Sequence, residues 1–545
     1  MRQSAWIPLA LVATVGAVVL ALVLGTGVER RADFVFDINT EPETIDPALI
    51  SGQPGGRIAN CLFEGLTQRH PRTLEPIPAV AERWSISEDG RVYTFHLRAC
   101  RWSNGDRVRA GDFVFQWERV LDPENAARYA NILYPIRNAE RYNRGDIDDF
   151  DRVGVHAGDD STLVVELTHP TAYFLDLCAF YPYFPSHPPT VRAYGDGWTR
   201  AEHLVGNGPF LLESWALRRG IRMRRNPLYW DATQVALETI EAVTIERAST
   251  GFNFYIAGHT DWVDSGSLPL FVMDAIRQRP DFHAAPYLNT YFYRINVTRP
   301  PLDDPRVRRA LSMAIDREAI VEHITRGGQL PARHLVPPGL PGYTSPVGPG
   351  YDPERARALL AEAGYPGGRG FPGFELLFNT SEAHKQIAEV VQQQWKRELG
   401  IDCELRNQEW KVFLNTCRAL EYDVSRGSWI GDYLDPSTFL DLWVPGNGNN
   451  RTGWSDSTYT ALVRRAAATT DAAARLDLLG EAERLLLDAQ PIIPIYFYVV
   501  LNCYRELWGG CEPNLLNVIY PKYVYRKGID SPHPVLLDAI AESAR

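Results

Sequence analysis

Catalytic and metal-binding residue types occur in this sequence without the spacing that their chemistry requires. The chain has seven cysteines and twelve histidines but no C-x-x-C or H-E-x-x-H pattern, so zinc-dependent and thioredoxin-like chemistry lack support. A G-x-S-x-G nucleophile elbow is also absent. Asp432 and Asp435 are close in sequence, and they leave a carboxylate-dependent hydrolase as a remote alternative. We therefore expect no enzyme, no metal site and no cofactor.

The cysteines indicate free thiols more than a disulfide framework. Seven cysteines cannot all pair within one chain, so at least one thiol must stay free. Cys503 and Cys511 are near enough in sequence to form a disulfide, but buried thiols are the alternative that we favour.

The first 31 residues differ in character from the rest of the chain. Residues 6–24 carry no charge, and charged residues flank them on both sides. This length approaches that of a membrane-spanning helix, so residues 1–31 are interpreted as a cleaved export signal or a retained membrane anchor. A core helix is the third alternative. The first cysteine, Cys61, lies too far along the chain for a lipid-modified cleavage site, and we expect the body of the protein outside the cytoplasm.

Length and composition predict a large folded protein with more than one lobe. The chain has 545 residues and a mass of 61.4 kDa, about twice what one hydrophobic core supports. With 45% apolar and 23% charged residues, it is too rich in core-forming side chains to be disordered. The net charge of -11 argues against nucleic acid as a partner.

The pattern of apolar residues predicts a mixed α+β fold. Residues 34–39 and 93–98 alternate apolar and polar side chains, as strands do, and residues 110–121 have helical spacing. Further along, we expect helices over residues 307–324, 352–364 and 382–399, and strands over 401–405 and 492–500. No internal repeat or low-complexity linker separates the lobes, so we expect them to be interleaved.

Several longer motifs carry a resemblance to a known family. The sequence is similar to the peptide and nickel extracellular solute-binding proteins of ABC importers, and within them it resembles the periplasmic oligopeptide-binding proteins. The similarity begins near residue 33 and continues to the C-terminus. The motifs are AVAERW at 79–84, YTFHLR at 93–98, WSNG at 102–105, AEAGY at 361–365, NTSEAHK at 379–385, NQEWK at 407–411 and WIGDY at 429–433.

The resemblance implies a two-lobed periplasmic binding protein fold with an extra third domain. Two hinge crossovers would join the halves, and the ligand would be enclosed between them. The implied division is lobe I from residues 32–64, 188–288 and 500–545, additional domain II from 65–187, and lobe III from 289–499.

The resemblance also implies which residues bind the two charged ends of a peptide. Asp432 matches the position that pairs with the N-terminal ammonium, and Arg426 and His384 match positions that meet the C-terminal carboxylate. Judged without the motif, Asp432 is a solvated loop residue, Arg426 a member of a surface ion pair and His384 an exposed residue at a helix start. A third basic position of the family is Thr325 here, and Arg326 or His323 are the possible substitutes.

Aromatic residues would line the side-chain pockets of such a site. The matching residues are Tyr129, Tyr287, Trp410, Trp429 and Tyr498, although each would be assigned to the core from composition alone. Ser51 replaces a glutamate that touches the ligand in the oligopeptide binders. Asn289 and Ile430 stand at two positions that form a disulfide in related proteins, so this bridge is expected to be absent.

These observations predict an extracytoplasmic substrate-binding protein that captures oligopeptides and delivers them to an ABC-type permease. The alternatives within the family are receptors for dipeptides, murein peptides or a nickel chelate. We expect a monomer in the periplasm, which is either free or, if the N-terminal segment is retained, tethered to the inner membrane.

Overall fold

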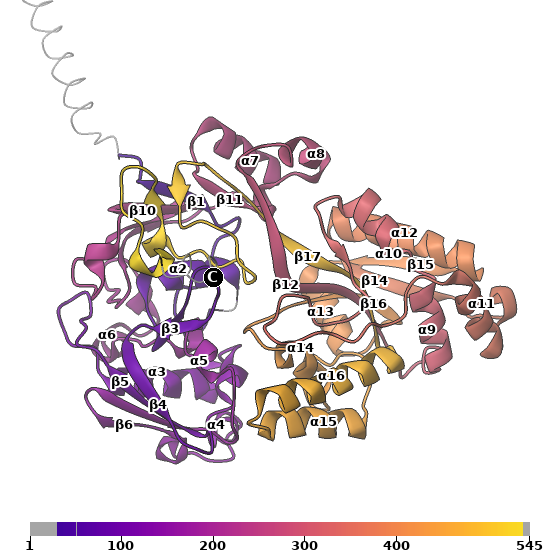
Figure 1. Ribbon diagram of the computed structural model, residues 1–545, viewed down its shortest axis with the longest axis horizontal. Helices are drawn as coiled ribbons and strands as arrows, with labels where there is room; N and C mark the ends of the chain where they lie inside the picture. The colour runs from indigo at the N-terminus through magenta and orange to yellow at the C-terminus, as the bar shows by residue number, and fades with distance from the viewer. Residues whose placement is uncertain (1–29, 51, 538–545) are drawn as a thin grey trace, which may run out of the picture.

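A mixed β-sheet passes through both halves of the molecule and determines how they are connected. The structure is a computed structural model that describes residues 30–50 and 52–537. The sheet has 11 strands in the order β15-β14-β16-β12-β17-β11-β1-β10-β9-β8, and β13 (Leu330–Pro331) pairs with β17. Figure 1 shows the two halves side by side, with strands running between them.

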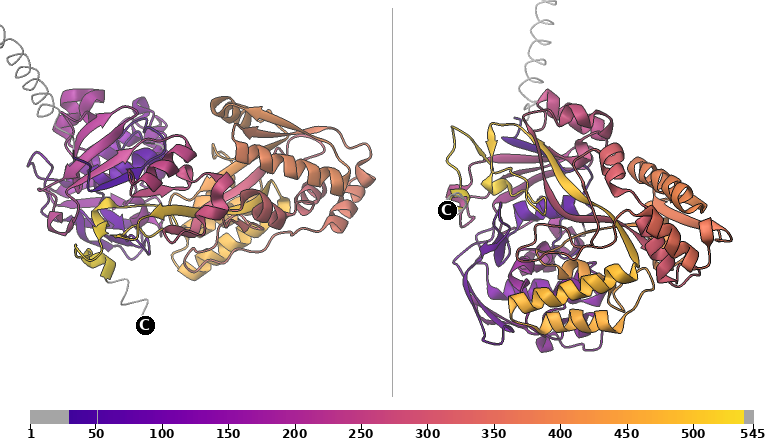
Figure 2. Two further views of the ribbon diagram at one scale, coloured as in Figure 1. Left: turned by 90° about the horizontal axis from the view of Figure 1, so that it is seen from above. Right: turned by 45° about the vertical axis from the view of Figure 1, so that its right-hand side comes forward.

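Two long antiparallel strands, β12 (Phe282–Ile295) and β17 (Ile492–Tyr504), carry the chain between the halves (Figures 1 and 2). At one end β17 also pairs with β11 (Trp262–Asp264), and at the other end β12 also pairs with β16 (Val424–Ile430). The pairing of β12 with β17 shifts register after Pro286, which has no N–H to donate to a ladder. The strand expected at 492–500 is confirmed and extends further than predicted.

The first half of the sheet includes the start of the described chain. Here β1 (Phe34–Asp37) pairs in parallel with β10 (Thr239–Val243), which continues through β9 (Gly220–Arg225) to β8 (Phe210–Ala216).

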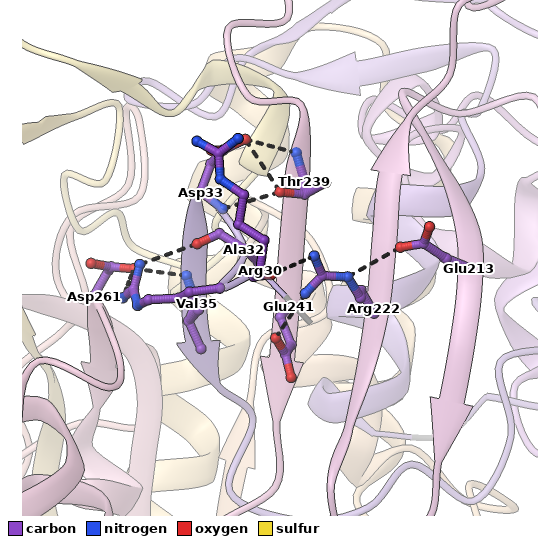
Figure 3. Close-up of polar contacts among 10 residues, drawn as sticks. Arg30, Ala32, Asp33, Val35, Glu213, Arg222, Thr239, Glu241 and Asp261 are labelled. Atoms are coloured by element: carbon purple, nitrogen blue, oxygen red, sulfur yellow. Dashed lines mark hydrogen bonds and ion pairs between the residues drawn. The ribbon is translucent and has the colours of Figure 1, made fainter. Parts of the chain in front are cut away.

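Polar contacts hold the chain in place just before β1 (Figure 3). Asp33 accepts a hydrogen bond of 3.0 Å from the Thr239 N–H, and Arg222 donates one of 2.8 Å to the Arg30 carbonyl. Asp261 accepts a hydrogen bond of 2.8 Å from the Val35 N–H. The first described residues are therefore fixed to the strands of this half.

A separate four-stranded antiparallel sheet packs beside the first half. Its order is β4 (Ala81–Ile86), β5 (Val92–Leu97), β7 (Thr162–Glu166) and β6 (Val155–Asp159), with α3 (Ala110–Leu121) against it. In β5 the alternate residues Tyr93, Phe95 and Leu97 are buried, as the sequence pattern predicts. One hydrophobic cluster includes this sheet and the first half together.

Helices cover both faces of the sheet in the second half. One face is covered by α9 (Pro305–Met313), α11 (Pro353–Glu362) and α12 (Glu382–Leu399), which pack on β14 (Phe374–Asn379) and β15 (Cys403–Gln408). The other face is covered by α15 (Ser457–Ala468) and α16 (Ala472–Ala489). The predicted helix 382–399 is confirmed, and it ends at Gly400, whose φ of 71° favours glycine.

The prediction of a single helix over residues 307–324 was wrong, because the structure has two separate helices, α9 and α10 (Arg317–Ile320), in this segment. After α9 the chain begins a new helix, α10, capped by the Asp316 carboxylate, which accepts a hydrogen bond of 2.9 Å from the Ala319 N–H. A side-chain cap of this kind competes with continuation of the preceding helix. The strand expected at 401–405 is also displaced by two residues, since β15 begins at Cys403.

The remaining α-helices and β-strands of the described residues are mostly short. The longer ones are helices α2 (Gln53–Leu62), α7 (Ala248–Ala257) and α13 (Trp410–Arg418). The short ones are β2 (Thr67–Arg69), β3 (Pro76–Pro78), α4 (Ala139–Asn143), α5 (Phe174–Leu177), α6 (Pro188–Tyr194), α8 (Met273–Ile276), α14 (Ser437–Leu440), β18 (Trp508–Gly509) and β19 (Tyr525–Arg526).

All seven cysteines are buried free thiols, so the possible Cys503–Cys511 disulfide is not formed. Over residues 30–50 and 52–537, no helix has both the length and the apolar character needed to span a bilayer. The apolar segment 6–24, interpreted as a signal or an anchor, lies outside the described residues.

Candidate functional site

Buried polar atoms without hydrogen-bond partners gather around β16. Buried polar groups are nearly always paired in folded proteins, and unpaired ones indicate an absent partner such as water or a ligand. Several of them lie on strands β12 and β16, and others lie on the neighbouring β14, β15 and α12. Among the described residues, they include side-chain atoms of Asn289, Arg294, Asn379, His384, Gln408, Ser425, Arg426 and Trp429.

One edge of β16 is open over most of its length. Along its other edge, β12 pairs with it from Ile295↔Val424 to Asn289↔Ile430. On the open side, β14 pairs only at Leu376↔Val424 and Leu377↔Ser425. From Arg426 to Ile430, no other described strand completes the pairing. Such an edge can accept an added strand from an extended peptide.

Asp432 lies just beyond the end of β16 and presents a desolvated carboxylate. Burial raises its pKa to about 7, and the positive charge of Arg69 opposes that rise only in part. Within the described part of the chain, no hydrogen bond reaches the carboxylate oxygens. A carboxylate in this state favours a cationic partner, because such a partner would offset the cost of its desolvation.

The loop that carries Asp432 is held by residues from the opposite half. Arg69 donates a hydrogen bond of 2.9 Å to the Asp432 carbonyl, and Asp176 accepts one of 2.8 Å from the Leu434 N–H. Arg69 and Asp176 also form a buried ion pair. Tyr433 stacks on Tyr173 with ring centroids 4.0 Å apart.

Tyr129 also lies near Asp432. Burial raises the pKa of Tyr129, and the negative charge of Asp432 raises it further. The Tyr129 ring packs edge-on against Tyr181, with centroids 6.0 Å apart. Burial raises the pKa of Tyr181, and Tyr129 and the Asp432 carboxylate raise it further. These tyrosines and Asp432 therefore face one another across the two halves.

Arg426 and His384 come together at the other end of the open edge. Arg426 is only 9% exposed, and it donates a hydrogen bond of 3.0 Å to the Tyr498 hydroxyl. Its guanidinium lies over the Tyr291 ring at 5.0 Å. Among the described residues it forms no ion pair with a carboxylate. Burial, together with the charge of Arg426, lowers the pKa of His384 to about 3, so this imidazole is neutral at physiological pH.

Of the remaining aromatic candidates, three contact the site and one does not. Tyr498 binds Arg426, as described above, and Trp429 on β16 has an unpaired indole N–H. The Tyr287 hydroxyl accepts a hydrogen bond of 2.6 Å from Gln53. Burial raises the pKa of Tyr287, and the nearby Tyr498 adds a smaller contribution. Trp410 is 49% exposed at the start of α13 and stacks on Phe413, apart from the others.

The structure describes one of the two positions at which the sequence departs from the related proteins, Thr325, but not the other. Ser51 lies outside the described residues. The Thr325 hydroxyl donates to the Val321 carbonyl at 3.3 Å. Neither possible substitute joins the site, because Arg326 pairs with Asp274 and His323 is exposed.

Two strand positions support the sequence alignment behind these assignments. Asn289 and Ile430, interpreted as the positions of a lost disulfide, stand directly opposite each other on β12 and β16. By contrast, the contacts of Arg69 and Asp176 with the Asp432 loop were missed, because residues so distant in sequence give no local signal.

The fold, the open strand edge and the unpaired charges define a solute-binding protein. The chain belongs to the bacterial extracellular solute-binding proteins, family 5, whose model (the family 5 Middle region) matches residues 75–451. The protein is therefore an extracytoplasmic one.

Individual relatives cover nearly the whole chain. The oligopeptide-binding protein OppA of Bacillus subtilis is 37% identical over 500 residues, which is 89% of this chain and 90% of that protein. The dipeptide-binding protein DppE of the same organism is 35% identical and covers 86% and 87%. The crystal structure of Haemophilus influenzae OppA in complex with RPPGFSPFR superposes with a TM-score of 0.79 at 31% identity, covering 91% of this chain and 99% of that one.

Proposed function

We propose that this protein binds oligopeptides outside the cytoplasm and delivers them to an ABC-type permease. The observation that carries the proposal is the open edge of β16 between Arg426 and Ile430, with a carboxylate near one end and a guanidinium at the other, neither of which has an ion pair among the described residues. A free peptide is a zwitterion with a backbone that can pair as a strand, so its charges and hydrogen-bonding groups match this arrangement.

The two ends of the peptide are assigned by charge. The N-terminal ammonium pairs with Asp432, whose side chain is partly buried and whose carboxylate has no hydrogen bond from the described residues. The C-terminal carboxylate meets Arg426, which Tyr498 orients, and His384 donates a hydrogen bond to it. Tyr129, Tyr287, Trp429 and Tyr498 line the space for side chains; Ser51 and Trp410 are assigned to it from the sequence alone.

The length of the open edge favours oligopeptides over dipeptides. Arg426 stands four residues before Ile430, a distance of about 13 Å in a strand that rises roughly 3.3 Å per residue. An extended peptide of about four residues spans that distance, whereas a dipeptide leaves one charged end short of its partner. Relatives named for oligopeptides and for dipeptides make the dipeptide the main alternative.

The halves are proposed to close on the peptide by bending at the two crossovers. The domain boundaries inferred from the sequence, near residues 288 and 499, fall within β12 and β17. Long strands that continue from one half to the other suit a hinge. Under this proposal the protein acts as a monomeric receptor in the periplasm, without chemistry on its cargo, and segment 6–24 either guides export or tethers it to the inner membrane.

Native mass spectrometry of the purified protein, followed by calorimetric titration with di- to pentapeptides, tests the function. Co-purified peptides of three to five residues, or tight binding across unlike sequences, are expected. A protein that is purified empty and binds none of these peptides would contradict the proposal. Incubation with the same peptides should leave them uncleaved, and the appearance of fragments would support the hydrolase alternative instead.

A further inference from the structure

Arg294, near the end of β12, is a buried cation whose donors are almost all unused. The residue is 6% exposed. Within residues 30–50 and 52–537 it makes one hydrogen bond, 3.3 Å from Nη1 to the Arg426 carbonyl, while its Nε has no partner. It has no carboxylate partner in the same part of the chain. A guanidinium offers five N–H donors, so this one is left largely unsatisfied.

Two other buried arginines in the same half provide a comparison. Burial lowers the pKa of Arg294, Arg308 and Arg317 alike to about 10. Arg317 donates to the carbonyls of residues 312, 315 and 494 and to a serine hydroxyl, and Arg308 donates to the carbonyls of residues 302, 303 and 489. Those two contribute to the structure of the half, whereas Arg294 has far fewer hydrogen bonds to offset the cost of its burial.

The guanidinium lies over β16, on the face that holds Ser425, Gly427 and Trp429. Arg294 is opposite Ser425, and the next pair on that face is Phe292 with Gly427. The guanidinium carbon is 5.1 Å from the Phe292 ring, and a Cβ at Gly427 would stand 2.7 Å from Nη1. Glycine at position 427 therefore leaves room for the guanidinium. The third pair on this face contains Trp429, whose indole N–H is unpaired.

The charges around Arg294 are positive. Arg451 is close enough for its charge to lower the pKa of Arg294, and its own contacts are hydrogen bonds of 3.4 Å to the Gly448 carbonyl and the Asn449 side chain. Arg418 lowers the pKa of Arg451 in turn, in addition to burial. Among the described residues none of these three arginines has an ion pair, although the chain carries a net charge of -11. An anionic group would complement this cluster of positive charges.

We propose that Arg294 selects peptides with an aspartate or glutamate side chain on this face of β16. The inference rests on the proposed function, because a peptide added to the open edge directs alternate side chains toward the face of Arg294 and Trp429. A carboxylate there can form two parallel hydrogen bonds with the guanidinium. Arg426, on the opposite face, remains the partner of the peptide C-terminus, so the two arginines read different groups.

The test is calorimetric titration with tetrapeptides of alanine in which the second or the third residue is Glu, Gln or Lys. At one of the two positions, the Glu peptide should bind at least tenfold more tightly than the Gln peptide, and the Lys peptide should bind most weakly. In Arg294→Gln the preference for Glu should disappear, while the affinity for the Gln peptide stays within about threefold of the parent value. Arg406→Gln, which changes a half-exposed arginine paired with Glu375, is the matched control and should keep the preference.

The outcomes separate this inference from the proposed function. If the neutral peptides bind and Glu gives no advantage at either position, the inference is wrong and the oligopeptide function stands. If none of the peptides binds, the proposed function fails. Titration with inorganic phosphate serves as a third arm, and tight phosphate binding that Arg294→Gln abolishes, without any preference for Glu, would overturn the inference in favour of a free anion.

Thermal melting shows whether the variant is folded. Because Arg294 has no anionic partner among the described residues, Arg294→Gln should melt at the same temperature as the parent or above it. If the variant does not fold, the comparison of Glu with Gln peptides on the parent still decides the inference.

Discussion

Peptide binding should depend most on Asp432, and protonation of its carboxylate should therefore change the affinity. Its pKa is raised to about 7, while a peptide amine has a pKa of about 8. Binding needs the carboxylate ionised and the amine protonated, so affinity should fall below pH 7 and again above pH 8. The groups facing the carboxylate, Arg69, Tyr129 and Tyr181, do not titrate in this range. Calorimetry between pH 5.5 and 9 checks this, and a flat profile would contradict it.

The same carboxylate should cost the free protein stability. Its pKa is raised on folding, so the folded state binds the extra proton between pH 4 and 7, and stability declines as pH rises through that window. Asp432→Asn removes the cost and should raise the free energy of unfolding at pH 8 by about 1–3 kcal/mol, while weakening peptide binding. Denaturant unfolding at pH 8 and at pH 4 measures this, and the gain should vanish at pH 4.

Arg69 and Asp176 should act on binding through the position of the Asp432 loop. Their buried ion pair leaves an uncompensated charge when one partner is removed, so Asp176→Ala should cost about 3–5 kcal/mol of stability. Asp176→Asn keeps the shape and should weaken peptide binding with a smaller loss of stability. Affinity and melting temperature measured together decide this, and unchanged affinity in Asp176→Asn would show that the contact with the Leu434 N–H has no part in binding.

At the scale of elements, the open edge of β16 should recognise the peptide backbone. A peptide that adds as a strand donates alternate amide N–H groups to the edge, and methylation of such a nitrogen removes the donor. Methylating each amide of a tetrapeptide in turn should reduce affinity at least tenfold at some positions and little at others. Equal affinity for all the methylated peptides would mean that the edge does not pair with the cargo.

Local elements were predictable from the sequence where one residue sets the boundary. Helix α12 has its apolar positions on one face and stops at Gly400, so its bounds match the prediction. The interruption between α9 and α10 was missed, because apolar spacing continues through it while the Asp316 cap begins a new helix. The motif at 429–433 pointed to Asp432, and the strand pattern before Arg426 predicted β16, but the absence of an ion pair at either side chain depends on neighbours that only the fold assembles.

The contacts that fix the candidate site were beyond prediction for the same reason. Arg69 and Asp432 are 363 residues apart, and no pattern in either segment indicates the other. In the sequence, Arg294 is likewise indistinguishable from other basic residues. The structure shows that it is buried without an ion pair to any described carboxylate.

At the scale of the whole molecule, peptide binding should make the protein more compact. The Asp432 loop is held by Arg69 and Asp176 of the opposite half, and β12 and β17 connect the halves. A peptide that contacts both sides stabilises the closed arrangement over more open ones. Small-angle X-ray scattering should show a smaller radius of gyration when a tetrapeptide is added. An unchanged radius would argue against closure by hinge bending.

Recognition of both free ends of a peptide is the central claim, and it is tested most directly by titrating one tetrapeptide in three forms. The unmodified peptide should bind tightly, and its N-acetylated form should bind at least a hundredfold more weakly, because the ammonium no longer reaches Asp432. The C-terminal amide should also bind weakly, since Arg426 loses its carboxylate. Equal affinity for all three forms would contradict the account, because it would show that neither charged end of the peptide is read.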